Sequence, residues 1–246
     1  MHALGIFLFS RRRLSAIARF LTVSAAVLSS GLVAFACHAQ VPPSSGEKAG
    51  YKGLFAAAAA GDAAALRTQL PRQSRPDERD AYGRTALHVA AYGGHRDAMR
   101  ILVQAGADPN AVERDRYDIV TIAAVANDVP TLKLALELGA SAKNVTSRYD
   151  GTALIAAAHL GHVEIVRVLI QAGAPLDHVN NLGWTALIES IVLGDGGPRH
   201  TETLRALIAA GANVNIADRD GRTPLALARR HGYSAMMMLL ERAGAT

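Results

Sequence analysis

The stretch that decides the fold is residues 80–107, which read DAYGRTALHVAAYGGHRDAMRILVQAGA. Its core returns at residues 152–174 as TALIAAAHLGHVEIVRVLIQAGA, with the threonine, the leucine, the paired alanines and the closing Gly-Ala in the same places. The frame returns again at 185–212 and at 223–245, and a degenerate copy lies around residues 120–140. A register that recurs at about 33 residues predicts a stack of similar structural units.

Each recurring residue has a physical reason to recur. Thr85 precedes the first helix of the unit, where its hydroxyl can accept a hydrogen bond from an unpaired backbone N–H. Leu87 is placed to enter the core, and Ala90 and Ala91 let neighbouring helices approach closely. Gly106 permits the left-handed backbone that ends the second helix. Because such a unit cannot bury its own apolar face, we expect stacking to stabilise it.

This frame resembles the ankyrin repeat, whose signature is a T-P-L-H core at a period of about 33 residues. The best matches are DRDGRTPL at residues 218–225 and DAYGRTALH at residues 80–88. Five copies cover residues 80–246, and a degenerate capping unit precedes them over residues 51–79. The resemblance implies an all-α fold, an ankyrin-repeat α-solenoid with short β-turn fingers. It also implies a non-enzymatic protein-binding module that uses no cofactor.

Two copies depart from the frame in informative ways. The second has Asp118 where the others have threonine. The fourth carries an insertion of five residues around 195–200, between its two predicted helices. We interpret the insertion as a tolerated loop and not as a feature that reads a partner.

The first 39 residues predict a secretory signal peptide. A cluster at Arg11 to Arg13 precedes an uncharged apolar run over residues 20–36, and small residues stand at the end of the segment. Residues 40–50 are then predicted as a flexible linker. Three alternatives are an uncleaved membrane anchor, a lipoprotein attached through Cys37, and twin-arginine export. We favour simple cleavage of the signal peptide, with the twin-arginine route second. All four interpretations of the segment place the chain outside the cytoplasm, and the location we expect is a bacterial periplasm.

Charge and cysteine content narrow the function further. The net charge of +5 comes mostly from the leader, which holds arginines and no acidic residue. The remaining chain is almost neutral, so it lacks the concentrated cations of a nucleic-acid-binding protein. Cys37 is the single cysteine and lies in or beside the leader. The mature chain is therefore predicted to contain no disulfide, catalytic thiol or thiolate metal site.

Histidine and acidic residues suggest chemistry in two places, and we favour a structural interpretation of both. His159 and His162 stand three apart, a spacing that could place both on one helix face as metal ligands. His162, however, occupies the predicted turn after the first helix of its unit. Glu189, Asp195 and His200 are not joined by a nucleophile at any catalytic spacing. We therefore predict no catalytic residue, no metal site and no cofactor.

One frame position carries a cation in five successive units. Stacked, these residues would form a basic column on the second helices of the units. We interpret the column as a solvated face and not as a strip for an acidic partner. The residues are Arg67, Arg100, Lys133, Arg167 and Arg205.

The positions that vary most between copies predict the binding surface. In an ankyrin-like stack they lie at the finger tips and on the exposed side of the first helices, which together line a concave face. Most are Tyr, Trp or Arg, the types that dominate protein-binding hot spots. The predicted residues are Tyr82, Arg84, Tyr92, Arg114, Tyr117, Arg148, Tyr149, Trp184, Glu189, Arg219, Arg222 and Arg230.

From these patterns we expect a monomer that binds another protein of unknown identity and no nucleic acid. Contact with a membrane would come only through an uncleaved or lipidated N-terminus. Two alternative functions are a secreted effector that binds host proteins and a scaffold tethered to the membrane.

Overall fold

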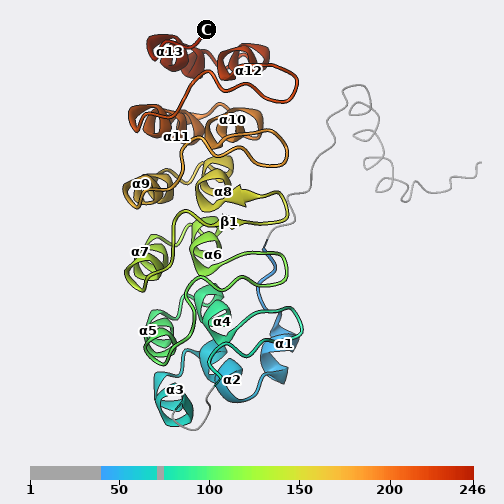
Figure 1. Ribbon diagram of the computed structural model, residues 1–246, viewed down its shortest axis with the longest axis vertical. Helices are drawn as coiled ribbons and strands as arrows, with labels where there is room; N and C mark the ends of the chain where they lie inside the picture. Colours follow the sequence, from blue (N-terminus) through green and yellow to red (C-terminus); the bar gives the residue numbers. More distant parts are fainter. Residues whose placement is uncertain (1–39, 71–74) are drawn as a thin grey trace, which may run out of the picture. The chain divides into compact units, whose positions relative to one another are not determined.

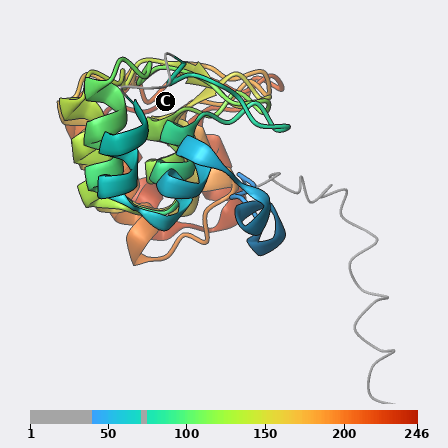
Figure 2. The ribbon, with the colours of Figure 1, turned by 90° about the horizontal axis from the view of Figure 1, so that it is seen from below.

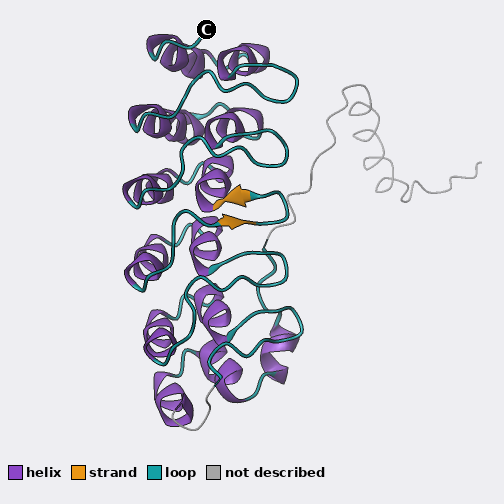
Figure 3. Cartoon of the chain, viewed as in Figure 1, coloured by secondary structure: helices purple, strands orange, loops and turns teal. Residues whose placement is uncertain are grey.

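The computed structural model describes residues 40–70 and 75–246. The predicted signal peptide, residues 1–39, lies outside the described residues. The described chain is a stack of helix pairs, and a loop projects from each junction between pairs toward one side (Figures 1 and 3). Within these ranges no helix combines the length and the hydropathy needed to cross a bilayer.

In each pair the helix nearer the projecting loops is called here the inner helix. The inner helices are α2 (Gly53–Ala60), α4 (Ala86–Tyr92), α6 (Ile119–Val125), α8 (Ala153–Leu160), α10 (Ala186–Val192) and α12 (Pro224–His231). The outer helices are α3 (Ala63–Gln69), α5 (Arg96–Gln104), α7 (Val129–Glu137), α9 (Val163–Gln171), α11 (Pro198–Ala209) and α13 (Ser234–Arg242). Each inner helix contacts the next along the stack. The predicted α-solenoid is thereby confirmed.

Polar caps begin the inner helices of the five repeats. Threonine does so in four of them, accepting a hydrogen bond of 3.2–3.4 Å from the backbone N–H three residues on: Thr85, Thr152, Thr185 and Thr223. In the degenerate second repeat Asp118 accepts the equivalent bond at 2.8 Å. Aspartate and threonine both reach the free N–H groups of a first helical turn. The departure from the frame therefore leaves this helix capped.

The core runs along the stack where the inner helices meet. Leu87 and Leu154 are fully buried, and Ala90 and Ala158 are equally inaccessible. The alanines allow α4, α6 and α8 to approach closely, and the leucines supply the buried apolar surface. Burying one leucine contributes about 1.5–3 kcal/mol.

Each projecting loop, called here a finger, closes on one polar side chain. That side chain accepts hydrogen bonds from the backbone N–H groups two and four residues further on. Its oxygen comes from a different residue type in different repeats because carboxylates, amides and hydroxyls all accept such bonds. The third finger also contains β1 (Val145–Thr146) and β2 (Gly151–Thr152), which pair antiparallel. The five fingers span 80–84, 113–117, 147–151, 180–184 and 218–222.

Histidines in the turns between paired helices tie each repeat to the one before it. His95 and His162 each donate a ring N–H to a main-chain carbonyl of the preceding inner helix, at 3.1 and 3.0 Å. In the fourth repeat the insertion brings His200 into this role, and its Nε2 bonds to the carbonyl of His159 at 2.9 Å. Its Nδ1 lies 2.7 Å from Asp195 Oδ1. The insertion therefore preserves the stacking contact.

The structure corrects the predicted flexible linker over residues 40–50. Ser45–Gly50 form a helix, α1, whose cap Ser44 accepts a bond from Glu47 N at 3.2 Å and donates its own N–H to Glu47 at 2.8 Å. This reciprocal capping box satisfies two N–H groups that would otherwise lack partners. The Pro-Pro and Ser-Ser-Gly composition conceals it, because composition carries no information about the pairing of Ser44 with Glu47. Figure 2 shows α1 on the side toward which the fingers project.

Candidate protein-binding surface

The fingers and the inner helices border one face of the stack, called here the inner face. It is formed by the five fingers together with α4, α6, α8, α10 and α12. Seen along the stack, the fingers extend away from the helices toward the side occupied by α1 (Figure 2). Tyr92, Glu189 and Arg230 lie on inner helices, and the other predicted binding residues lie on the fingers.

Nine of the twelve predicted residues keep accessible surface. Tyr82 is the most informative, because 45% of this large side chain is exposed at the tip of the first finger. The other exposed residues are Arg114, Arg148, Arg219 and Arg230. The half-buried ones are Tyr92, Tyr149, Trp184 and Arg222.

The expectation of exposure is wrong for three of the predicted residues. Arg84, Tyr117 and Glu189 are only 2%, 7% and 4% exposed. Arg84 and Tyr117 directly precede the caps of α4 and α6. At that position the chain turns from finger into helix, so the side chain enters the junction between neighbouring elements.

Arg84 is the centre of a buried charged cluster. Its Nε donates to Asp80 Oδ2 at 2.7 Å, and its Nη2 donates to Glu47 of α1. Tyr51, just after α1, donates its hydroxyl to Asp80 Oδ2 at 2.7 Å. The cluster thereby joins the first finger to a segment that precedes the repeats. Glu47, Tyr51 and Asp80 are not among the binding residues predicted from the sequence, although the Ser-x-x-Glu spacing of Ser44 and Glu47 is a signal for the start of the helix that carries Glu47.

Hydrogen bonding keeps the members of this cluster charged. The pKa of Glu47 falls to about 2, because the Ser44 hydroxyl and backbone N–H donate to the carboxylate and Arg84 adds a further bond. Burial opposes ionisation of Asp80, yet bonds from Tyr51 and Arg84 hold its pKa below the ordinary value. Burial similarly opposes the charge of Arg84, but its bonds to the two carboxylates raise its pKa.

Aromatic surface adjoins the cluster. The guanidinium carbon of Arg84 lies 4.5 Å from the centre of the Tyr82 ring, and that of Arg114 lies 5.6 Å from it. Cations at these distances are attracted to the ring face. Tyr92 is half-buried on α4, and burial raises its pKa. The first finger therefore combines arginine and tyrosine, the residue types that form protein-binding hot spots.

Glu189 forms a second buried polar group, on α10. Its Oε1 accepts a hydrogen bond from Asn180 at 2.9 Å, and its Oε2 lies 3.7 Å from Nδ1 of His159 on α8. Burial raises the pKa of Glu189 to about 7 and lowers that of His159. The pair lacks a nucleophile within these contacts, and we assign it a structural role.

Arginines at the finger tips join consecutive fingers. Arg114 donates to the carbonyl of Ala81, and Arg219 donates to the carbonyl of Asn181. Arg148 donates to Asp115 at 2.6 Å. These side chains remain exposed at their outer surfaces, so they stabilise the finger row and still border the inner face.

The basic column lies on the outer helices, where all five of its residues are exposed. Three of its residues have acidic neighbours: Arg100 is 3.7 Å from Glu137, and Arg205 is 3.1 Å from Glu202. Arg167 lies 2.7 Å from the same Glu202. Mixed charge of this kind favours the interpretation as a solvated face.

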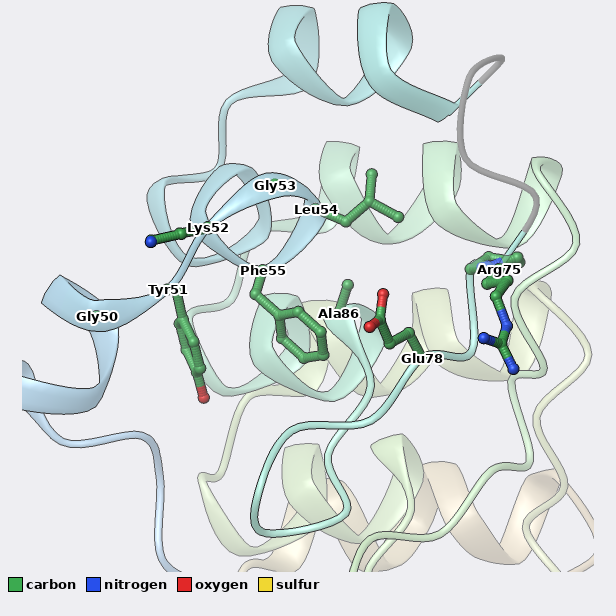
Figure 4. A pocket seen from close by; sticks show the side chains of 10 residues that line it. Gly50, Tyr51, Lys52, Gly53, Leu54, Phe55, Arg75, Glu78 and Ala86 are labelled. Atoms are coloured by element: carbon green, nitrogen blue, oxygen red, sulfur yellow. The ribbon is translucent and has the colours of Figure 1, made fainter.

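The described residues offer little for a small ligand or a metal. A pocket of about 370 Å³ lies beside α2, with Lys52, Phe55, Arg75 and Glu78 in its lining (Figure 4). We assign it no ligand. Across residues 40–70 and 75–246, no group of three or more His, Cys, Asp or Glu side chains is placed to hold a metal ion.

The two histidines considered as metal ligands lie on different elements. His159 belongs to α8, whereas His162 is the residue directly before α9. His162 bonds to a carbonyl of the second repeat and His159 faces Glu189. Their spacing in sequence therefore does not make them neighbours on one helix.

Stacked helix pairs with capped inner helices and projecting fingers define an α-solenoid built from repeats. The repeats are ankyrin repeats: the family model described as "Ankyrin repeats (3 copies)" matches residues 24–113 and 120–218. The chain therefore belongs to the ankyrin-repeat family, which confirms the resemblance seen in the sequence.

Known relatives agree with this assignment. The chain is 33% identical over 167 residues to the putative ankyrin repeat protein YahD of Escherichia coli K12, covering 68% of this chain and 83% of that protein. A solved ankyrin repeat domain from Acinetobacter baumannii AYE is 44% identical, with a TM-score of 0.75 over 78% of this chain and 98% of that one. The ankyrin repeat domain of Bcl-3 is 27% identical, with a TM-score of 0.72 over 80% and 88% of the two chains.

Proposed function

We propose that this ankyrin scaffold binds another protein through its inner face, without catalysing a reaction, in the periplasm or cell envelope of a bacterium. The observation that carries the proposal is the row of aromatic side chains on that face. Tyr82 is 45% exposed, and Tyr149 and Trp184 keep accessible surface two and three fingers further along. Such residues bury a large area on binding while losing little side-chain entropy.

The chemistry of the described residues supports binding over catalysis. The charged cluster at Arg84 and the polar group at Glu189 are both satisfied by contacts within the fold. The location is supported by the amino-terminal sequence, which has the arrangement of a signal peptide. Bacterial relatives in Escherichia coli and Acinetobacter baumannii are consistent with a bacterial setting.

Affinity capture tests the binding proposal. The bait is residues 40–246, offered to envelope proteins of the source bacterium. A second bait carries Tyr82→Ala, Tyr149→Ala and Trp184→Ala. A matched control carries Arg100→Ala and Lys133→Ala on the outer helices. We expect one protein to be retained by the wild type and the control and lost by the aromatic variant, with circular dichroism showing that all three fold. Equal retention by all three baits would place the contact elsewhere.

Cell fractionation tests the location. Expressed at natural levels, the full chain should appear in the periplasmic fraction with the mass expected after removal of residues 1–39. An unprocessed chain in the membrane fraction would favour a tethered scaffold. Recovery from the culture medium would favour a secreted effector. Light scattering of the purified chain tests the expectation of a monomer.

A further inference from the structure

The two carboxylates that pair with Arg84 come from different parts of the chain, one from the first repeat and one from a segment that precedes the repeats. Asp80 belongs to the same finger as Arg84 and accepts from its Nε at 2.7 Å. Glu47 comes from α1 and accepts from the terminal nitrogen Nη2. The finger therefore orients the guanidinium, and α1 supplies the second carboxylate.

The last finger provides an internal comparison. Arg222 stands at the same frame position as Arg84 and its Nε donates to Asp218 at 2.9 Å in the same way. Its terminal nitrogen, however, pairs with Asp220 of its own finger. The Arg222 side chain stays 38% exposed, against 2% for Arg84. A finger arginine thus needs no outside carboxylate when the finger itself provides one.

The first finger lacks that internal partner. The residue equivalent to Asp220 is Tyr82, whose ring lies against the Arg84 guanidinium at 4.5 Å. Asp80 pairs with Nε but Tyr82 has no carboxylate to offer Nη2, so Nη2 is left for a carboxylate that arrives from elsewhere. An arginine fork bordered by an aromatic ring is well suited to recognise a carboxylate.

The helix that carries the present occupant buries none of its own residues. α1 has six residues, and the contacts that hold it are made by Glu47 and by its neighbours, the buried Pro43 and the half-buried Tyr51. A helix this short is not stable by itself, because nucleation costs more than one turn returns. Glu47 is 24% exposed but Arg84 only 2%, so a competing group reaches the guanidinium as α1 leaves. Tyr51 bonds to Asp80 independently of Glu47, which allows α1 to leave without unravelling the finger.

We propose that Arg84, with Tyr82 beside it, is a carboxylate-binding site on the inner face that Glu47 fills in the free protein. An acidic segment of a protein partner displaces α1 and places an Asp or Glu side chain on Arg84. This inference rests on the proposed protein-binding function and names the chemistry of the partner. A neutral segment would leave Nη2 of a desolvated guanidinium without a carboxylate, with Asp80 still paired to Nε, so the site discriminates against it.

The test uses the chain's own segment as the probe. A fluorescent peptide with the sequence of residues 42–52, PPSSGEKAGYK, is titrated into the full chain and into a Glu47→Gln variant, with anisotropy as the readout. In the variant the internal ligand has lost its charge. We expect the variant to bind the peptide at least about tenfold more tightly than the wild type does. Equal affinity for the two proteins, or no binding to either, would overturn the proposal.

Changes in the peptide avoid any question of folding. A peptide with Gln in place of the glutamate should lose the binding, and retention would show that the carboxylate is not what is recognised. On the protein, Arg222→Gln in the Glu47→Gln background should leave peptide affinity unchanged. Arg84→Gln in the same background should abolish it, with circular dichroism confirming helix content.

The outcome is separable from that of the capture experiment. Specific peptide binding with no envelope protein retained would support the carboxylate site and count against the envelope partner. An envelope protein lost from the aromatic variant, without peptide binding, would do the reverse.

Discussion

The first and fourth repeats begin their inner helices alike and then bury opposite kinds of ionisable group. Thr85 and Thr185 cap α4 and α10, and Leu87 and Leu187 follow at the same core position. One residue later the first repeat buries His88, whereas the fourth buries Glu189 two residues after its leucine.

Burial has the same physical effect on both groups and opposite consequences for pH. Low polarity disfavours the charged form, which lowers the pKa of His88 to about 4 and raises that of Glu189 to about 7. The neutral histidine has lost a proton and the neutral glutamate has gained one. Histidine burial therefore favours the fold at higher pH, and glutamate burial favours it at lower pH. The first and fourth repeats therefore contribute opposite pH responses, although their inner helices begin alike.

The largest expected effect is loss of the first repeat's histidine. His88 Nδ1 accepts from the backbone N–H of Thr85 at 3.1 Å and lies 2.8 Å from its hydroxyl. His88→Ala removes this capping pair and leaves a cavity, so we expect the free energy of unfolding to fall by about 4 kcal/mol. Urea unfolding at pH 7 measures it. The exposed His231→Ala is the control and should stay within about 0.5 kcal/mol.

The sign of the His88 contribution is also testable. Its folded pKa of about 4 lies below the ordinary histidine pKa of 6.5. The stability is therefore fully present above pH 6.5 and is lost as the pH falls toward 4. The His88→Ala variant should lack this part of the acid loss, and an unchanged pH profile would contradict the assignment.

Next in size is Glu189→Gln in the fourth repeat. The folded pKa of about 7 lies above the ordinary glutamate pKa of 4.5. The stability that the neutral acid contributes is therefore present below pH 4.5 and is lost as the pH rises through 7. Glutamine keeps the shape and can still accept from Asn180. We expect a gain of up to about 3 kcal/mol at pH 8 and almost none at pH 4.

Urea unfolding at both pH values measures this effect. Glu202→Gln, on the outer helix of the same repeat, is the matched control and should show no such gain. Equal stability of Glu189→Gln and the wild type at pH 8 would mean that the carboxylate is solvated in the fold.

A smaller effect on stability is expected from the histidines that tie the turns of the fourth and first repeats to the preceding repeat, His200 and His95. His200 is 6% exposed and bonds to both Asp195 and the carbonyl of His159, whereas half-buried His95 bonds to one carbonyl. We expect His200→Ala to cost about 2 kcal/mol and His95→Ala about 1 kcal/mol. Thermal unfolding of the two variants should preserve that order. The reverse order would mean that the inserted turn is only loosely attached.

Much of the fold could be predicted because its determinants are local and recur. The threonine caps, the paired alanines and the Gly-Ala ends act within one repeat, so a single frame applied to the sequence finds them. Asp118 shows the same logic, since a different residue meets the same local need. The helix α1 was not predicted, because it occurs once and does not follow the repeat frame. Its cap is local, but the contact that docks it on Arg84 joins residues that are distant in sequence.

The candidate surface was harder to predict because exposure depends on contacts between distant residues. Arg84 and Arg222 occupy equivalent positions, yet only the first meets Glu47, 37 residues away. Glu189 looked exposed in the frame, whereas Asn180 and His159 enclose it. A position in a repeat specifies where a side chain starts, and its neighbours in other repeats determine whether it reaches solvent.

The smallest expected effect comes from the basic column, where the first and fourth repeats should behave alike. Arg100 and Arg205 are exposed on α5 and α11, and each faces a glutamate at 3.7 and 3.1 Å. Solvent screens such pairs, and ordering the long side chains offsets much of the attraction. Arg100→Ala and Arg205→Ala should each change the free energy of unfolding by less than about 0.5 kcal/mol. A loss above about 1 kcal/mol from either, in urea at low salt, would show that the outer helices depend on these charges and that the column is more than a solvated face.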